Sequence, residues 1–251
     1  MEKMHERTAL LLGSDGVERL KNAHVLLFGL GGVGSYTAEA LARAGVGALT
    51  LVDDDTVSET NLNRQLVALR STVGKNKAQV AADRIRDIDP DCRVTVVPMF
   101  YMPETADRLP FDGPVRYDYI VDAIDTVTAK LEILRRAQAA GVPVISSMGT
   151  GNKLHPERLE LTMLSKTSGC PLARVMRQEC RKRGIRDVRV VYSTEPPISA
   201  KGAVEPPAGT ADGGERPGAP KKTVPGSVSF VPGAAGLMLA GAVVRALAGV
   251  D

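Results

Sequence analysis

The sequence GLGGVG at residues 29–34 follows the apolar run HVLLF and precedes SYTAEALARAG, a segment with the apolar spacing of a helix. Glycines at the first, third and sixth positions of such a stretch allow a tight turn, close approach of the backbone to phosphate, and close packing of a helix on a strand. The pattern predicts a nucleotide-binding turn, with NAD and ATP both possible. The candidate nucleotide-binding glycines are Gly29, Gly31, Gly32 and Gly34.

Composition sets limits on the protein class. The chain has 251 residues, 43% of them hydrophobic, which suffices for one α/β core with or without a small lobe. Its net charge of +3 permits a polyanionic partner without requiring one. The three cysteines, Cys92, Cys170 and Cys180, are too far apart for a Cys-x-x-Cys zinc pair and are odd in number, so we expect a reducing compartment. Charges interrupt residues 1–20 and leave no apolar core of signal-peptide length, so we do not expect a secretory signal there.

Apolar, β-branched runs alternate with helical patterns in the first 150 residues. This alternation predicts an α/β fold, a Rossmann-like doubly wound and mainly parallel sheet with a C-terminal extension. The predicted strands cover residues 24–28, 48–52, 93–97, 119–122 and 142–146, and the predicted helices cover 36–44, 75–88 and 127–140.

The pattern weakens after residue 150. We expect a strand at 159–164, a helix at 171–184, strands at 188–193 and 227–232, and a buried Gly/Ala-rich terminal helix, because Arg245 interrupts an otherwise membrane-like stretch. Residues 195–226 are rich in Pro and Gly and predict a mobile loop. We therefore expect a single adenylating-type domain over 1–251, with a nucleotide-binding core at 1–150 and a substrate-side extension at 151–194 and 227–251.

Polar residues after the second strand bear on the nucleotide. Asp53 lies nineteen residues after Gly34 at a strand end, where a carboxylate accepts hydrogen bonds from ribose hydroxyls. An ordinary acidic turn is the alternative. The stretch TNLNRQ then supplies Asn61, Arg64 and Gln65, and Lys77 follows, which we place one turn into the next helix. An arginine and a lysine near a glycine turn suit a triphosphate and a departing pyrophosphate, whereas a dehydrogenase does not need them.

The stretch VDAIDT places two carboxylates at the end of a predicted strand. Open α/β sheets bind their ligands at that edge. We expect Asp125 to hold Mg²⁺ on the phosphates and Asp122 to cap the following helix.

Taken together, GLGGVG, LVDDDTVSETNLNRQ, VGKNKAQVAADRI and VDAIDT resemble the adenylating core of ubiquitin-activating-like enzymes, over about residues 5–150. The resemblance implies that ATP activates a carboxylate as an acyl-adenylate. By position it assigns Asp53 to the ribose, Asn61, Arg64 and Lys77 to the phosphates, and Asp125 to Mg²⁺.

Arg7, in HERTALLLG, resembles an arginine that members of this family contribute to the ATP site of the partner subunit in a homodimer. The resemblance therefore implies a homodimer. The catalytic candidates are Arg64, Lys77, Asp125 and Arg7.

Beyond residue 150, the runs KTSGCPLAR and YSTE resemble a zinc-free branch of the family, the tRNA threonylcarbamoyladenosine dehydratases. The activators of sulfur-carrier proteins usually carry two Cys-x-x-Cys pairs, which are absent here. The resemblance implies that ATP activates the threonine carboxylate of a modified adenosine beside the anticodon, so that a neighbouring group closes a ring with loss of water. An intramolecular nucleophile needs no enzyme thiol, and we interpret Cys170, at a helix start, as incidental.

A basic run at residues 174–189 fits a tRNA partner, although a merely solvated basic face is the alternative. Helical spacing directs Leu172, Val175 and Met176 inward. The tRNA-binding candidates are Arg174, Arg177, Arg181 and Lys182.

The first hypothesis is a cytoplasmic, homodimeric dehydratase that uses ATP, Mg²⁺ and tRNA, without a DNA or membrane partner; a cysteine desulfurase or other sulfur-transfer partner stays open. The alternatives are an adenylyltransferase for a sulfur-carrier protein, a nucleotide-sensing module without turnover, and, more distantly, an NAD-dependent dehydrogenase.

Overall fold

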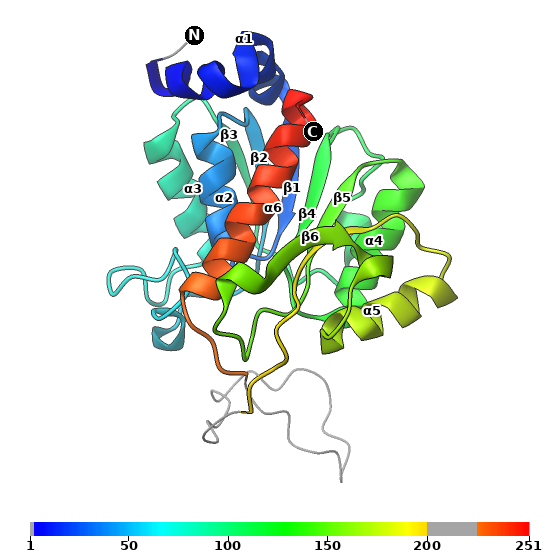
Figure 1. The fold of residues 1–251 in the computed structure, drawn as a ribbon. Coiled ribbons are helices and arrows are strands. Elements are labelled where there is room, and N and C mark those ends of the chain that lie inside the picture. Colours follow the sequence, from blue (N-terminus) through cyan, green and yellow to red (C-terminus); the bar gives the residue numbers. More distant parts are fainter. Residues whose placement is uncertain (1–2, 200–224, 251) are drawn as a thin grey trace.

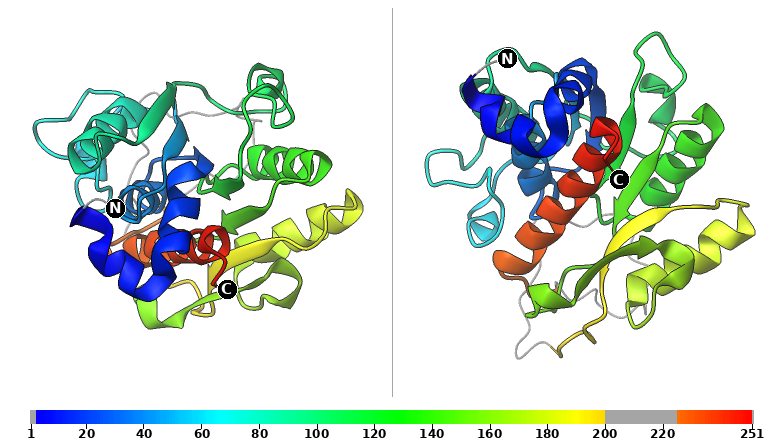
Figure 2. Two further views of the ribbon diagram at one scale, coloured as in Figure 1. Left: turned by 90° about the horizontal axis from the view of Figure 1, so that it is seen from above. Right: turned by 45° about the horizontal axis from the view of Figure 1, so that its top comes forward.

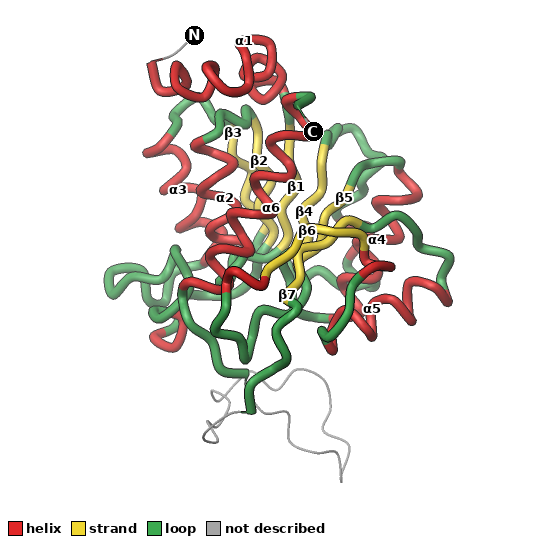
Figure 3. The backbone as a smooth tube through the Cα atoms, in the orientation of Figure 1, coloured by secondary structure: helices red, strands yellow, loops and turns green. Residues whose placement is uncertain are grey.

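The computed structural model describes residues 3–199 and 225–250. A sheet of seven strands lies at its centre, in the order β3-β2-β1-β4-β5-β7-β6 (Figure 3). All neighbours pair in parallel except the edge strand β6, which is antiparallel to β7. The predicted Rossmann-like, mainly parallel sheet is confirmed. The strands are β1 (His24–Phe28), β2 (Ala48–Val52), β3 (Arg93–Val97), β4 (Tyr119–Asp122), β5 (Val144–Ser147), β6 (Leu159–Met163) and β7 (Arg189–Ser193).

Strand β1 shows why these apolar runs form central strands. Val25 and Leu27 belong to the hydrophobic cluster on one face of the sheet, and Leu26 and Phe28 to the cluster on the other face. All four side chains are fully buried. Because both faces of a parallel sheet are covered, its strands are apolar throughout instead of alternating with polar residues.

Helices cover both faces (Figure 1). Helices α2, α3 and α6 contribute to the cluster on one face, and α4 with α5 cover the other. Helix α1 crosses the end of the sheet where β1 begins (Figure 2). The helices are α1 (Glu6–Asn22), α2 (Gly34–Arg43), α3 (Lys77–Ile88), α4 (Val127–Ala140), α5 (Pro171–Lys182) and α6 (Phe230–Ala248), with short 3-10 helices η1 (Lys3–His5), η2 (Glu59–Asn61), η3 (Ala106–Arg108), η4 (Pro156–Arg158) and η5 (Leu164–Lys166).

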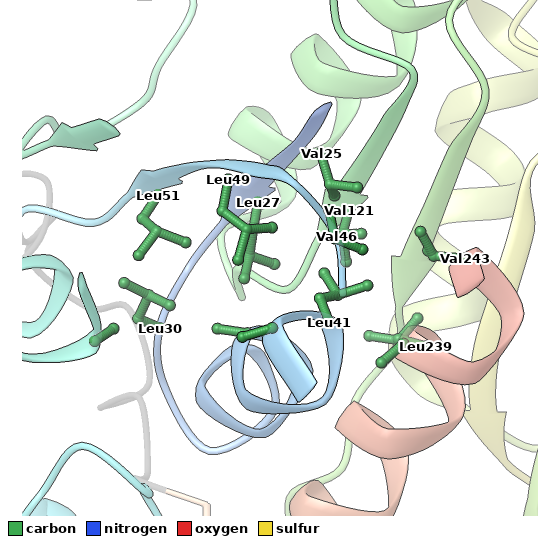
Figure 4. Close-up of a cluster of buried hydrophobic side chains, with 14 of the residues drawn as sticks. Val25, Leu27, Leu30, Leu41, Val46, Leu49, Leu51, Val121, Leu239 and Val243 are labelled. Atoms are coloured by element: carbon green, nitrogen blue, oxygen red, sulfur yellow. The ribbon is translucent and has the colours of Figure 1, made fainter. Parts of the chain in front are cut away.

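The predicted terminal helix, α6, is part of the core. A Cβ atom at Gly236 would lie 2.3 Å from the carbonyl oxygen of Val33, so glycine allows α6 to pack directly on the start of α2. Leu239 and Val243 fill the space between this helix pair and the sheet (Figure 4). Among the described residues, α6 is the one helix long and apolar enough to span a membrane, and half of that stretch is buried inside the fold.

Several predicted boundaries need correction. The strand expected at 227–232 is wrong, because α6 begins at Phe230 and the neighbouring sheet edge is already formed by β6. Helix α3 begins at Lys77, where the side chain of Asn76 caps it by accepting a hydrogen bond from the Gln79 N–H. Strand β5 begins at Val144, two residues later than expected. Most of the predicted 195–226 loop, residues 200–224, lies outside the described residues.

Candidate active site

The strand order places a ligand site between β1 and β4. These strands are neighbours at the centre of the sheet, and the chain leaves them toward opposite edges. In such sheets the crevice outside the carboxyl ends of the two strands is the usual binding position. We call this side of the sheet the carboxyl edge; it lies toward the bottom of Figure 1. The segment 29–34, which we call the glycine turn, follows β1, and Asp125 follows β4.

Two of the four glycines are required by the backbone. Gly29 has a φ of 84°, and a Cβ there would lie 2.9 Å from the carbonyl oxygen of Ala123. A Cβ at Gly34 would lie 1.8 Å from the carbonyl oxygen of Gly29, which no side chain tolerates. The turn therefore closes tightly on itself and on the loop after β4. This loop, residues 123–126, carries Asp125.

The other two glycines have different surroundings. A Cβ at Gly31 would meet only the Gln65 amide nitrogen, at 3.7 Å, which is an ordinary contact. A Cβ at Gly32 would lie 3.2 Å from Pro232 in the first turn of α6 and 3.6 Å from Cγ of Arg64. Gly32 thus allows α6 and the arginine to approach the turn, while Gly31 leaves space there.

Asp53 is tied to the glycine turn. Its carboxylate accepts a hydrogen bond of 2.6 Å from the Leu30 N–H and one of 2.9 Å from the Asp55 N–H. Burial raises the pKa of Asp53, against the opposing effects of Lys77 and of the two N–H donors. A partly buried carboxylate held beside a glycine turn matches the expected partner of ribose hydroxyls.

Lys77 lies near enough to Asp53 to lower the pKa of its carboxyl group, and it forms an ion pair with Asp55. It is the first residue of α3, not one turn into that helix as expected, and only 4% of it is exposed. Its Nζ lies 2.7 Å from a carboxylate oxygen of Asp55, whose own side chain is 65% exposed. Because Asp55 faces solvent, a phosphate can compete with it for the ammonium group.

The segment 61–66 is fastened to the glycine turn through Ser35. The Ser35 hydroxyl donates to the Gly31 carbonyl at 2.6 Å and accepts from the Leu66 N–H at 3.1 Å. Within the segment, Arg64 is half-buried, and its Nη1 donates to the Thr60 carbonyl and the Asn63 side chain, both at 2.8 Å. Burial lowers the pKa of Arg64, and an arginine guanidinium keeps its positive charge in proteins.

Asn61 and Gln65 flank the arginine in different ways. The Asn61 side-chain oxygen accepts the Ser58 N–H at 3.1 Å, so this buried amide holds η2 in place. Gln65 is also buried, and its Oε1 has no hydrogen-bond partner among the described residues. An unpartnered buried polar atom beside Gly31 needs a ligand or water. Gln65, which the sequence places with Asn61 and Arg64 among the phosphate-binding residues, therefore lies beside the glycine turn.

The two carboxylates after β4 have separate roles. Asp125 is exposed, and among residues 3–199 and 225–250 its carboxylate accepts a single hydrogen bond, of 3.5 Å, from the Thr126 hydroxyl. The prediction that Asp122 caps the following helix is wrong, because Thr126 occupies the cap position of α4. Asp122 forms a fully buried ion pair with Lys130, at 2.9 Å, and accepts a hydrogen bond from Ser146. The site can therefore use Asp125, whereas Asp122 is structural.

Arg7 lies at the opposite end of the sheet. The adjoining His5 ring packs on Gly45, shortly before β2 begins, and Arg7 itself is exposed on the first turn of α1. Within one subunit the fold does not bring Arg7 to the carboxyl edge.

The basic face of α5 is partly engaged within the protein. Arg177 donates to the Thr167 carbonyl at 2.8 Å and also to its hydroxyl, and Lys182 pairs with Glu179 at 2.6 Å. Arg174 and Arg181 are exposed. Val175, which we expected to face inward, is 41% exposed, and the buried face is formed by Ala173, Met176 and Cys180 instead.

All three cysteines are buried. Burial raises the pKa of Cys92 to about 12 and that of Cys180 to about 11, so both thiols stay protonated at neutral pH. Thiol chemistry depends on an accessible thiolate. No cysteine in this conformation offers one to a sulfur donor.

The surroundings of the glycine turn fit ATP and Mg²⁺. The space at Gly31, the unpartnered Gln65 oxygen, the Asp53 carboxylate and the cations of Arg64 and Lys77 suit a nucleotide with its phosphates. The exposed Asp125 carboxylate is a hard oxygen donor of the kind that Mg²⁺ prefers.

Comparison with known proteins identifies the family. Residues 5–251 match the model of the ThiF family. The chain is 44% identical to a tRNA threonylcarbamoyladenosine dehydratase of Bacillus subtilis, over 96% of this chain and 93% of the relative. It superimposes with a TM-score of 0.82 on the crystal structure of the Escherichia coli tRNA N6-threonylcarbamoyladenosine dehydratase in complex with ATP, at 34% identity, covering 98% of this chain and 94% of that chain. The AMP complex of the Escherichia coli enzyme gives a TM-score of 0.81 at 33% identity, covering 97% and 93% of the two chains. Together with the glycine turn and its polar surroundings, these matches show that the chain belongs to the ThiF family and, within it, to the tRNA threonylcarbamoyladenosine dehydratases.

Proposed function

We propose that this protein uses ATP to dehydrate threonylcarbamoyladenosine beside the anticodon of tRNA, closing the threonyl substituent into a ring. The observation that carries the proposal is the gathering of Asp53, Arg64, Lys77 and Asp125 around a turn that is closed by Gly29 and Gly34. The similarity to dehydratases over nearly the whole chain supports the choice of substrate.

In the first step the threonine carboxylate attacks the α-phosphorus of ATP. A bond from the carboxylate oxygen to phosphorus forms, the bond to the bridging oxygen breaks, and pyrophosphate leaves with the electron pair. Negative charge builds on the departing phosphates, where Arg64 and the Lys77 ammonium stabilise it. The glycine turn keeps backbone N–H groups close to the α-phosphate, and Asp53 orients the ribose.

In the second step a neighbouring nucleophilic group of the same substituent attacks the activated carbonyl carbon. The bond to AMP breaks, AMP leaves, and the proton of the nucleophile passes to solvent, so one water is lost overall. Because the nucleophile belongs to the substrate, its effective concentration is high. No enzyme thiol is required, which agrees with the burial of all three cysteines. A cysteine desulfurase or sulfur-acceptor partner is therefore not part of this proposal.

Mg²⁺ held by Asp125 would neutralise phosphate charge when bound. The exposure of this carboxylate next to the glycine turn supports the assignment. Asn61 acts indirectly, by fixing η2 and with it the segment that carries Arg64.

We further propose a homodimer in which Arg7 of one subunit completes the ATP site of the other. Leu10 and Leu11, on the same helix, are 84% and 86% exposed, an apolar pair that a second copy would cover. We place this reaction in the cytoplasm, without a DNA or membrane partner. The extension formed by residues 151–194 and 227–251 would face the tRNA, with Arg174, Arg177, Arg181 and Lys182 of α5 as the basic residues nearest to it.

The activity is tested by mass spectrometry of nucleosides after incubation of modified tRNA with the protein, ATP and Mg²⁺. The product should be lighter by one water, and AMP and pyrophosphate should form in equal amounts. Arg64→Ala and Lys77→Ala should each lower turnover by about a hundredfold or more. Unchanged nucleoside with wild-type protein would refute the proposal. Pyrophosphate exchange stimulated by a sulfur-carrier protein and not by tRNA would instead identify an adenylyltransferase.

The role of Arg7 is tested by mixing two inactive variants, Arg7→Ala and Lys77→Ala. If Arg7 acts across the dimer, subunit exchange restores one intact site in each mixed dimer, or about a quarter of wild-type activity. Recovery should require Leu10 and Leu11, so the same mixture carrying Leu10→Asp and Leu11→Asp should stay inactive. Absence of recovery in a mixture shown to contain mixed dimers would exclude action across the dimer.

A further inference from the structure

A groove of about 680 Å³ opens at the C-terminal end of α5. Helix α5 is labelled at the lower right of Figure 1. Its walls are η5, the last turns of α5 and the loop 184–188 that leads into β7. We call it the α5 groove. Three arginines line it, Arg177, Arg181 and Arg186, against a single acidic residue, Asp187. The groove is therefore positively charged.

The arginines of the α5 groove differ from the basic residues beside it. Lys182 and Arg183 both pair with Glu179, so their charge is balanced within the protein. Neither Arg181 nor Arg186 has a carboxylate partner among residues 3–199 and 225–250. Both are exposed. Arg181 and Arg186 share the groove with one carboxylate, that of Asp187, and neither forms an ion pair with it, so both guanidinium groups are available to an anion.

The loop that carries Arg186 is held in place. Gln138 of α4 donates to the Gly184 carbonyl at 3.2 Å and accepts the Arg186 N–H at 2.8 Å. Gly184 and Asp187 have φ angles of 68° and 54°, a conformation that is uncommon for a residue other than glycine. A fixed loop presents Arg186 to the groove with little loss of backbone freedom on binding.

Helix α5 links the α5 groove to the carboxyl edge. A Cβ at Gly169, just before α5, would lie 3.5 Å from the carbonyl oxygen of Thr194, just after β7. Since a helix rises about 1.5 Å per residue, the twelve residues of α5 span about 18 Å. Arg174 lies seven residues before Arg181, hence on the same side of the helix and about 10 Å away. A single ligand that contacts both the carboxyl edge and the groove must span about 18 Å, a distance that several nucleotides of an RNA strand cover.

We propose that the α5 groove binds a backbone phosphate of the RNA substrate, with Arg181 and Arg186 as its contacts. Guanidinium groups bind phosphate oxygens in a bidentate manner. The C-terminal end of a helix carries partial negative charge, so the arginine side chains alone make this site attractive to an anion. The inference rests on the proposed tRNA substrate and adds a contact remote from the ATP site.

The test measures tRNA binding by fluorescence anisotropy over a range of salt concentrations. The double variant R181Q/R186Q should bind tRNA about tenfold more weakly at low salt. The slope of log affinity against log salt concentration should become shallower by roughly one to two, which corresponds to the loss of one to two phosphate contacts. In turnover the loss should appear in KM for tRNA. R183Q removes one charge from the same helix end but lies outside the groove lining, and it should match wild type. Arg177 is left intact because its bonds to Thr167 hold η5 against α5.

Because binding is measured separately from turnover, the two proposals fail in different ways. Equal tRNA affinity for R181Q/R186Q and R183Q, or wild-type protein that does not bind tRNA, would overturn the phosphate site. Binding that depends on Arg181 and Arg186 but leaves the nucleoside unchanged would support the groove and reject the dehydratase activity. Thermal unfolding of each variant checks that the fold is retained.

Discussion

Lys130 and Asp122 form an ion pair of 2.9 Å in which both side chains are fully buried. The same Lys130 Nζ also donates to the Ile124 carbonyl at 2.9 Å. The pair therefore joins α4 to the end of β4 and fixes the loop that carries Asp125. A buried charge without its partner is strongly destabilising, so this pair supports both the fold and the position of the candidate Mg²⁺ ligand.

Lys130→Met should lower the free energy of unfolding by about 3–5 kcal/mol, because it leaves the Asp122 carboxylate buried and unpaired. The double variant K130M/D122L removes both charges and should recover much of this loss. Urea unfolding measures both. Lys182→Met, at the exposed pair with Glu179, is the control and should change stability by less than about 1 kcal/mol. A K130M protein as stable as K182M would contradict the prediction.

Alanine at two positions of the glycine turn should affect different properties: stability at Gly34 and ATP binding at Gly31. Gly34→Ala places a Cβ 1.8 Å from the Gly29 carbonyl oxygen, and relieving that clash should cost about 3 kcal/mol or more and disrupt the turn. Gly31→Ala meets only an ordinary 3.7 Å contact with Gln65 and should stay folded. Its added methyl group should weaken ATP binding, which calorimetry measures. If G34A folds as stably as G31A, the tight closure of the turn is wrong.

His24 should make stability depend on pH below neutrality. Burial lowers its pKa below 6.5, while Asp118 raises it and Arg93 lowers it. The unfolded chain therefore binds this proton more readily than the folded protein does. The free energy of unfolding should fall as the pH drops below about 6.5 toward the folded-state pKa, and should not depend on His24 above that range. Urea unfolding of wild type and His24→Gln at pH 5 to 7.5 tests this, since the variant should lack this part of the pH dependence.

Local patterns made much of the fold predictable from sequence. Strands β1 and β4 are predictable because each is a short run whose apolar residues are buried on both faces of the sheet. The glycine turn is predictable from the spacing of its glycines. Among the first five strands, three of the four consecutive pairs are neighbours in the sheet, namely β1–β2, β2–β3 and β4–β5, and all of these strands are parallel. Asp53 and Asp125 could therefore be placed at one sheet edge from the sequence. The basis for this placement is that Asp53 and Asp125 each follow the end of a parallel strand.

The partners of charged side chains were not predictable, because the sequence around a charged residue in a helix does not show whether its side chain is solvated or paired. Nothing in the sequence around Lys130 indicates a buried position, yet the residue is fully buried. Arg177 looked available to RNA, yet it bonds to Thr167 across a turn. Val175 lies outside the buried face because α5 packs through Ala173, Met176 and Cys180. Helix α1 was missed because charged residues and Gly13, with a φ of 73°, interrupt its pattern.

Asp125 should be important for catalysis and not for folding. Its side chain is exposed and, within the described part of the chain, accepts only a 3.5 Å hydrogen bond from Thr126. Asp125→Asn should therefore change the free energy of unfolding by less than about 0.5 kcal/mol. If the carboxylate holds Mg²⁺, D125N should need a higher Mg²⁺ concentration for half-maximal turnover and be about tenfold or more slower at saturation. The neighbouring Thr126→Val, which removes the hydroxyl donor but keeps the carboxylate, is the matched control. Equal Mg²⁺ dependence in D125N and wild type would exclude Asp125 as the metal ligand, whatever the activity of the variant.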